Sequence, residues 1–455
     1  MRDSVDAAIV AMDANGDGVA DVGGTRVAVA FTIPGERVRL RLPARASGQR
    51  PARAALLEIL EPSPHRVVPP CPHFGPQATS TPPCGGCAWQ HIAYPEQLRL
   101  KTDIVDRAVH EAVPDAPGAR PMLTATPDPW GFRHKVHFVF GDSSGRLTMG
   151  HLARGSRRVV PVDQCPVHAS AGNTVAFALR DACRRGSVRG WEPGKPTQAA
   201  LRGVAVRVGH ASHETMATLV VAHDRDRDLR DATRRALGEG VVAGLHLNVH
   251  HRDDGMIFGA ATRRLRGIDR LREEVAGVSF LISPTAFFQT NVAAAELLVR
   301  LVLEAVPPEL PVLDLYAGAG LFSLPLAKRG HAVTAVEGNR DAVADGQASQ
   351  RLNHITEGRC QWIAAPVEAS VKKLQAAGAV ILDPPREGCA NGVLEHVFKD
   401  RGPSLAVYLS CNPDTLGRDL AAIVRHGYLV ESVQPVDMFP HTPHIETVVE
   451  LRRRS

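Results

Sequence analysis

The last 180 residues of this chain alternate between short apolar runs and amphipathic segments, and this alternation restricts the possible folds more than any other feature. The apolar runs are bounded by turn residues and lie at 311–317, 331–338, 360–365, 378–385 and 404–411. Such runs are typical of parallel strands that are covered on both faces, and the segments 321–330 and 340–355 between them predict helices. We therefore predict a doubly wound, Rossmann-like α/β domain over residues 276–455.

The sequence before this domain predicts two further domains. Residues 1–62 hold four or five short β-rich runs separated by turn residues, which predict a small β-barrel of the oligonucleotide-binding type. A proline-rich linker follows at 60–76. Residues 63–275 combine a helical pattern at 94–113 with several β-like runs, so we expect a central α+β domain with a mixed or antiparallel sheet.

The composition excludes several classes of protein. Hydrophobic residues make up 44% and charged residues 22%, which excludes a disordered chain. A net charge of +5 permits a nucleic-acid partner without requiring one. No apolar stretch approaches the ~20 residues that cross a bilayer, and the N-terminus carries acids where a signal peptide is basic. We expect a cytoplasmic protein with no membrane partner, a monomer by default, whose eight cysteines are ligands, nucleophiles or buried thiols.

A small-residue turn follows the first predicted strand of the C-terminal domain. Gly318 and Gly320 allow the backbone to approach a ligand at the carboxyl end of the sheet. The next strand ends at Glu337, whose carboxylate can accept hydrogen bonds from both hydroxyls of a ribose. Together with Asp314, this favours nucleoside binding over a turn that serves packing alone. A dinucleotide fingerprint would place glycine where Ser323 stands, which disfavours a nicotinamide cofactor.

Two reactive side chains end neighbouring apolar runs. Asp383 ends one run and is followed by two prolines, and Cys411 ends the next. Because the carboxyl ends of parallel strands open on the same crevice, we expect both side chains there. A cysteine in such a position is most often an inert buried thiol. The Asn-Pro turn after Cys411 favours instead an exposed thiol at a helix start, where its pKa is lowered.

Five segments occur in the order and at the separations of one protein family. They are SPTAFFQTN at 283–291, DLYAGAG at 314–320, ILDPPREG at 381–388, LSCNPDT at 409–415 and PVDMFPHTPHIETV at 435–448. Over essentially its whole length the chain resembles the RNA uracil-5-methyltransferase family. The resemblance implies a methyl donor, S-adenosylmethionine, and a target uridine in RNA. It also implies that Cys411 adds to carbon 6 of uracil, so that carbon 5 can attack the methyl group, and that Glu446 removes the carbon 5 proton.

The resemblance further assigns residues to the cofactor and to the reacting end of the substrate. These residues are Gln289, Tyr316, Glu337 and Asp383, together with the turn glycines Gly318 and Gly320. Phe287 and Phe288 either stack on a flipped base or belong to the core. Two positions depart from the family pattern: Leu321 stands where some relatives carry asparagine, and no Asp or Asn lies near Ala365, where the adenine is often contacted.

The N-terminal segment resembles the TRAM domain, an RNA-binding barrel. Six arginines and no acid lie between Arg37 and Leu57; composition alone favours a solvated strand face, whereas the resemblance implies phosphate binding. The segment 129–138 also resembles a family segment, and in it Trp130, Arg133 and Lys135 are candidates to contact RNA. We expect single-stranded or loop RNA, because the target base must leave the stack. Ribosomal RNA is favoured over transfer RNA because the barrel and a cysteine cluster occur together.

Four cysteines have the spacing of metal ligands: Cys71, Cys84, Cys87 and Cys165. The spacing alone fits either a zinc ion or an iron–sulfur cluster and favours zinc. Thiols without a metal are the remaining alternative. The family resemblance implies a [4Fe-4S] cluster on these four residues. The twelve residues between the first two ligands exceed the usual interval and are interpreted as a loop insertion. The remaining cysteines, Cys183, Cys360 and Cys389, receive no role.

Two alternative functions are considered beside uridine methylation. The first is methylation of an exocyclic amine of a nucleic acid, but such enzymes favour an aromatic residue where Arg386 stands, and they have no use for a cysteine at a strand end. The second is a non-enzymatic iron–sulfur protein that binds RNA. The intact cofactor turn and the pair Cys411 and Glu446 argue against it.

Overall fold

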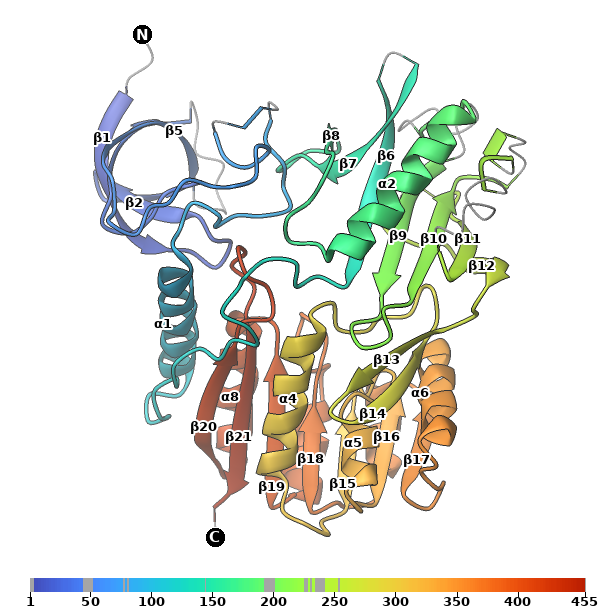
Figure 1. Cartoon of the computed structure of the whole chain (residues 1–455). Helices are drawn as coiled ribbons and strands as arrows, with labels where there is room; N and C mark the ends of the chain where they lie inside the picture. Colours follow the sequence, from blue (N-terminus) through green and yellow to red (C-terminus); the bar gives the residue numbers. More distant parts are fainter. Residues whose placement is uncertain are drawn as a thin grey trace.

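The computed structural model describes residues 4–43, 52–76, 78–79, 82–143, 145–191, 201–224, 228–229, 231–233, 242–252 and 254–454. These residues form an N-terminal barrel, a central sheet and a C-terminal sheet, which lie at the upper left, upper right and bottom of Figure 1. None of the described helices is long and apolar enough to cross a membrane. The predicted domain boundaries, 1–62, 63–275 and 276–455, stay a prediction.

The described N-terminal strands close into a barrel in the order β1-β2-β3-β5-β4, with β3 and β5 parallel. Its strands are β1 (Ser4–Met12), β2 (Gly18–Val22), β3 (Thr25–Val29), β4 (Arg37–Arg41) and β5 (Ala52–Glu61). Alternate residues such as Ile9, Val29 and Leu40 fill the interior, as period-2 patterning requires. The predicted small barrel is confirmed.

The central sheet has the order β12-β11-β10-β9-β6-β7-β8 within the described chain, and its pairs are antiparallel except for β10 with β11. Its strands are β6 (Lys135–Ser143), β7 (Arg146–Leu152), β8 (Val159–Pro161), β9 (Leu201–Val208), β10 (Thr215–Val221), β11 (Gly244–Val249) and β12 (Ala261–Gly267). Helix α2 (Ser170–Arg185) packs against β9 and β10. The expected mixed sheet with a helix is confirmed, and the hairpin β13 (Leu271–Val275) and β14 (Val278–Ile282) leads to the next sheet.

The C-terminal sheet has the order β17-β16-β15-β18-β19-β21-β20 among the described residues, with β21 antiparallel to both neighbours. Its strands are β15 (Val312–Leu315), β16 (Val333–Glu337), β17 (Cys360–Ala364), β18 (Ala379–Leu382), β19 (Leu405–Ser410), β20 (Tyr428–Val436) and β21 (Glu446–Arg453). Strands β15, β18 and β19 are buried throughout, which explains their unbroken apolar sequences.

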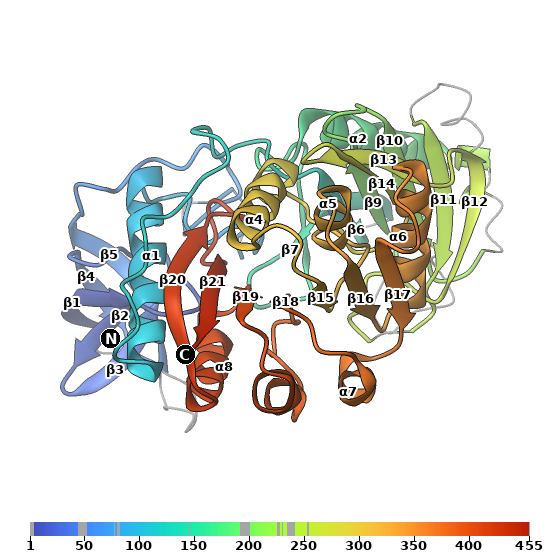
Figure 2. The same ribbon diagram turned by 90° about the horizontal axis from the view of Figure 1, so that it is seen from below.

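Helices cover both faces of this sheet, as Figure 2 shows. One face carries α4 (Val292–Ala305), α5 (Ser323–Lys328) and α6 (Arg340–Leu352), and the other carries α7 (Val367–Ser370) and α8 (Pro413–Arg425). A 3₁₀ turn at Val371–Lys373 and a π-helix at Glu395–Arg401 complete the described helical segments of this region. The predicted Rossmann-like domain is confirmed.

Helix α1 (Tyr94–Ala112) precedes the central sheet in sequence but packs against α8 and β20. Its apolar residues Leu100, Ile104 and Val105 join the hydrophobic core of the C-terminal sheet. The two helices approach closely at Gly417, where an added Cβ would lie 2.7 Å from the carbonyl oxygen of Ala108. The C-terminal sheet is therefore covered partly by residues that lie far upstream in the chain.

Candidate active site

Cys411 and Glu446 lie opposite each other at one edge of the C-terminal sheet. Cys411 directly follows β19, and Glu446 is the first residue of β21. These strands are antiparallel neighbours in which Ser410 pairs with Thr447, so the next position brings Cys411 opposite Glu446. Opposite residues of antiparallel strands have Cα atoms about 4.5–5.5 Å apart. The fold thus brings together the two side chains that the family resemblance marks as catalytic.

Asp383 lies near this pair and acts electrostatically on both of its members. It directly follows β18, the other neighbour of β19, and its backbone N–H donates a hydrogen bond to the carbonyl oxygen of Leu315 at 3.3 Å. The negative charges of Glu446 and Asp383 both raise the pKa of the Cys411 thiol. Strand ends that are separate in the sequence therefore place a thiol between two carboxyl groups.

The Cys411 thiol is half-buried and precedes a capped helix. The side chain of Asn412 accepts a hydrogen bond from the backbone of Asp414 and so begins α8. Burial is the main cause that raises the thiol pKa to about 11, and the nearby Arg386 acts in the opposite direction, so the prediction of an exposed thiol with a lowered pKa is wrong. A free protein at neutral pH consequently holds a thiol, and the reactive thiolate requires a change in charge around the sulfur.

Burial also raises the pKa values of the two carboxyl groups near Cys411, those of Glu446 and Asp383. Glu446 is 7% exposed, and burial, with a smaller contribution from Asp383, raises its pKa well above the ordinary range. The pKa of Asp383 rises to about 7 because of burial and the nearby Asp314. A carboxylate with a raised pKa is a stronger base, which suits proton removal from carbon.

A cavity of about 620 Å³ lies beside the glycine turn, although Gly318 and Gly320 themselves do not line it. Tyr316 and Glu337 line it, as do segments 366–368 and 387–391. Glu337 accepts hydrogen bonds from the backbone N–H of Gly318 at 2.9 Å and of Asn339 at 2.6 Å, so its carboxylate is held at the end of β16. The cavity is within the usual size range for small-molecule sites.

The conformation of the glycine turn explains its residue types. Gly318 and Gly320 have φ angles of 56° and 85°, in the left-handed region that glycine adopts without strain. An added Cβ on Gly320 would lie 2.9 Å from the ring of Trp362, so packing also requires glycine there. Tyr316 has a φ of 64° as well, which is uncommon for an aromatic residue.

Some of the residues assigned to the cofactor lie outside this cavity. Asp383 lies near Cys411, and Gln289 is buried between Phe288 and Thr290, which line a different cavity. Conversely, Glu368 lines this cavity, whereas the sequence analysis looked only for Asp or Asn near Ala365. A search extended by one helical turn past the end of β17 would have found it.

The two adjacent phenylalanines have different environments. Phe288 is 4% exposed and contacts Phe280, with ring centroids 5.3 Å apart, so it belongs to the core. Phe287 is 72% exposed at the rim of the cysteine-lined cavity. Phe287 is therefore the member of this pair whose ring is open to stack on another aromatic group.

All four cysteines that have metal-ligand spacing line one cavity of about 400 Å³. They are Cys71, Cys84, Cys87 and Cys165, each half-buried. Burial raises the pKa of every one of these thiols, to about 11 for Cys87 and about 12 for Cys165. The fold has therefore gathered residues from three separate segments around one space despite the long interval after Cys71.

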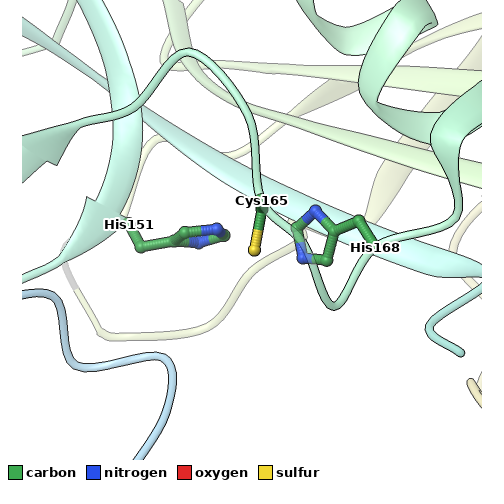
Figure 3. Close-up of side chains that lie close together, drawn as sticks. All are labelled: His151, Cys165 and His168. Atoms are coloured by element: carbon green, nitrogen blue, oxygen red, sulfur yellow. The ribbon is translucent and has the colours of Figure 1, made fainter. Parts of the chain in front are cut away.

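Two histidines flank Cys165 in this cavity (Figure 3). The ligand atoms of His151, Cys165 and His168 all lie within 4.8 Å of one another. Among the described residues, this is the one group of three His, Cys, Asp or Glu side chains close enough to share a metal ion. Several buried polar atoms at the cavity have no hydrogen-bond partner: Gln90 Oε1, Arg133 Nε, His151 Nε2, His168 Nδ1 and Thr290 Oγ1. Unpartnered buried atoms are costly, so their presence makes this cavity a candidate binding site.

The side chains expected to contact RNA are mostly occupied within the protein. The ammonium group of Lys135 donates to the carbonyl oxygen of Ala286 at 3.2 Å, and the half-buried guanidinium of Arg133 lies over the ring of Phe439. In the barrel, Arg39 forms ion pairs with Asp6 and Glu58. Arg37 and Arg53 also pair with acids, whereas Arg45 and Arg50 lie outside the described residues.

A doubly wound sheet with a glycine turn and an acid at the end of the next strand defines a Rossmann-like methyltransferase domain. Residues 269–454 match the family model described as tRNA (Uracil-5-)-methyltransferase. An RNA methyltransferase of Gloeobacter violaceus is 36% identical over 98% of this chain and 95% of its own length, and one of Halalkalibacterium halodurans is 30% identical over 100% and 98%. The chain belongs to the RNA (uracil-5-)-methyltransferase family, whose members are enzymes that depend on S-adenosylmethionine.

A solved structure has the same overall fold. The tRNA (uracil-54, C5)-methyltransferase of Pyrococcus abyssi, in complex with S-adenosyl-L-homocysteine, is 25% identical, with a TM-score of 0.78. The similarity covers 98% of this chain and 100% of that one, so it includes the barrel and the central sheet.

Proposed function

We propose that this enzyme transfers a methyl group from S-adenosylmethionine to carbon 5 of a uridine in RNA through a covalent adduct with Cys411. The observation that carries the proposal is the placement of Cys411 opposite Glu446, with Asp383 beside them. Methylation of an exocyclic amine needs no nucleophile, and a non-enzymatic RNA-binding protein needs neither residue.

The proposed reaction assigns a separate step to each of the two side chains. The Cys411 thiolate forms a bond to carbon 6 of uracil, and the displaced electron pair makes carbon 5 nucleophilic. Bound S-adenosylmethionine supplies the methyl group that carbon 5 attacks. The Glu446 carboxylate then takes the proton from carbon 5, and the electrons of that C–H bond restore the 5,6 double bond and expel the thiolate.

The test uses RNA that contains 5-fluorouridine. Fluorine at carbon 5 cannot be removed as a proton, so the adduct cannot break down after methyl transfer. We expect a protein–RNA complex that survives denaturing electrophoresis and forms only with S-adenosylmethionine present. Absence of this complex, while ordinary RNA is methylated, would exclude the covalent route.

We propose that the cofactor occupies the cavity beside the glycine turn. The cavity volume of about 620 Å³ and a carboxylate at its edge fit a nucleoside, because the Glu337 oxygens can accept hydrogen bonds from ribose hydroxyls. Gly318 and Gly320 keep the turn free of side chains. The bound S-adenosyl-L-homocysteine in the Pyrococcus abyssi relative supports the same ligand class.

The Glu337→Gln substitution is expected to weaken cofactor binding with little change in stability. Glutamine keeps the size of the side chain but loses the charge, and a hydrogen bond to a charged group is worth about 1.5–3 kcal/mol, or roughly 10- to 100-fold in Kd. Isothermal titration calorimetry with S-adenosylhomocysteine measures the change. Glu431→Gln, at an exposed ion pair on β20, is the matched control and should bind normally.

We propose that the RNA is ribosomal, because the barrel and the cysteine-lined cavity occur in one chain. Transfer RNA is the second candidate, favoured by the similarity to the Pyrococcus abyssi enzyme. Methylation of purified ribosomal and transfer RNA in parallel, followed by mass spectrometry of nuclease fragments, distinguishes them. Methyl incorporation into transfer RNA alone would overturn the ribosomal assignment.

We propose that the four cysteines hold a [4Fe-4S] cluster. The residues fit such a group because four thiols and several unpartnered polar atoms face one cavity. A single zinc, with Zn–S bonds of about 2.3 Å, would bring its sulfurs to roughly 3.8 Å of one another. Within the described chain, no three of these sulfurs lie within 4.8 Å of one another, which is wider than a single zinc bound by all four would require.

Protein purified without oxygen is therefore expected to contain iron and acid-labile sulfide in about equal amounts. Cys84→Ser should lose both, whereas Cys183→Ser, in the core of the central sheet, should keep both. The measurement is colorimetric analysis of iron and sulfide together with metal analysis. Zinc without sulfide would show instead that a mononuclear site occupies the cavity.

A further inference from the structure

The loop that joins β20 to β21 ends at the proposed base. It comprises residues 437–445, and Val436 before it pairs with Glu446 after it. Among the described residues, burial and the charge of Asp383 raise the pKa of Glu446, and no hydrogen bond to its carboxylate contributes. The position of this carboxylate is therefore set by its backbone, which the strand pairing of β21 fixes on one side and the loop fixes on the other.

Helix α1 holds the beginning of the loop through a buried ion pair. The ammonium group of Lys101 lies 2.6 Å from the Asp437 carboxylate, and both side chains are fully buried. Lys101 also donates to the carbonyl oxygen of Phe439 at 3.0 Å, and the hydroxyl of Tyr94 donates to Asp437 at 2.9 Å. Tyr94, Lys101 and the intervening Gln97 lie on one face of the helix, as the spacing of three and four residues requires.

The middle of the loop is held at His441. Its backbone N–H donates to the side-chain oxygen of Gln97 at 2.8 Å, and the amide nitrogen of Gln97 lies 3.1 Å from the imidazole Nδ1. The carbonyl oxygen of His441 accepts from the N–H groups of Ala88 and Trp89, at 2.9 and 3.0 Å. Its ring stacks on Trp130, with centroids 3.9 Å apart.

His441 has a backbone conformation that few side chains adopt. Its φ is 64°, which non-glycine residues maintain only where their surroundings impose it. The surroundings here are Gln97, which is fully buried, and two backbone donors that directly follow Cys87. The contacts thus fix a strained residue five positions before Glu446 and also join the catalytic loop to the cysteine-lined cavity.

We propose that His441, held by Gln97, is a positioning residue that places the Glu446 carboxylate for removal of the carbon 5 proton. This inference rests on the proposed covalent reaction. The first half of that reaction uses Cys411 and the cofactor cavity, which lie outside the loop. Loosening the loop should therefore impair the breakdown of the methylated adduct and spare its formation.

The experiment compares three variants on two RNA substrates. Valine is β-branched and opposes a positive φ, whereas asparagine tolerates it, so His441→Val should lose the loop conformation and His441→Asn should keep it. Gln97→Leu removes the contacts from the helix side. Turnover is expected to fall roughly 10- to 100-fold in His441→Val and Gln97→Leu, which is less than the loss expected when a general base is removed. In His441→Asn, turnover should stay within about threefold of the wild-type value.

The discriminating measurement is the amount of covalent complex on ordinary uridine RNA. We expect it to accumulate in His441→Val and Gln97→Leu, and to be undetectable in the wild type and His441→Asn. RNA containing 5-fluorouridine needs no base, so every variant should trap it at the wild-type rate, which also verifies folding and cofactor binding.

Two results would overturn the positioning role. One is wild-type turnover in both His441→Val and Gln97→Leu. The other is a parallel loss of turnover and of 5-fluorouridine trapping in both variants, because a purely structural role would impair both steps equally. Failure of the wild-type protein itself to trap 5-fluorouridine RNA would instead refute the proposed function, so the two failures are distinguishable.

Discussion

Cys411→Ala is expected to lose methyl transfer to RNA by at least about 10⁴-fold and to form no covalent complex with 5-fluorouridine RNA. Without the sulfur, nothing adds to carbon 6, and carbon 5 of uracil remains too weak a nucleophile to attack the methyl group. The residue is half-buried at a strand end, so the smaller side chain should leave the fold intact. Transfer of labelled methyl groups and denaturing electrophoresis measure the two effects.

The matched control is Cys183→Ala, which removes a buried thiol from α2 in the central domain. It should retain methyl transfer and trapping, because this thiol lies in a different hydrophobic core from the active site. Binding of S-adenosylhomocysteine should be unchanged in both variants, since Cys411 does not line the cofactor cavity. A covalent complex that persists in Cys411→Ala would assign the nucleophile to another residue.

The C-terminal sheet was predictable because its strands are apolar throughout. A strand such as β18 or β19 is buried on both faces, so every position carries the signal. The glycine turn and Glu337 were predictable for a similar reason, since they follow directly from where the strands end. Local sequence therefore located the glycine turn, the acid that follows it and the strand end that carries Cys411.

The placement of Glu446 was not predictable from local sequence. Strand β21 lies between β19 and β20, although it follows both in the chain. This insertion brings Glu446 opposite Cys411, and no local pattern specifies strand order. Without the family resemblance, Glu446 is an acid at the edge of an apolar run.

The role of α1 was hidden for a different reason. Its amphipathic pattern predicts that polar residues face water, yet Gln97 and Lys101 are fully buried. Their partners, Asp437 and His441, lie more than 330 positions later in the sequence. A buried polar side chain and an exposed one look alike in a sequence, so long-range contacts of this kind appear only in the structure.

Glu446→Gln is expected to reduce turnover by roughly 10²- to 10⁴-fold and to accumulate the covalent complex on ordinary RNA. Glutamine has nearly the same shape but cannot take the carbon 5 proton, so methyl transfer proceeds while thiolate release stalls. Quench-flow sampling with denaturing electrophoresis measures both stages. Glu450→Gln, on the same strand, is the control and should turn over normally.

The pH dependence of adduct breakdown provides an independent check on the same residue. Burial raises the pKa of Glu446 in the free enzyme, so the ionised fraction that can accept a proton increases with pH over a range above the ordinary one for a carboxyl group. Breakdown of the methylated adduct should accelerate with pH in the wild type, and this dependence should vanish in Glu446→Gln. Equal pH profiles for both proteins would assign proton removal to another group, and Asp383, whose charge raises the pKa of Glu446, would be the next residue to test.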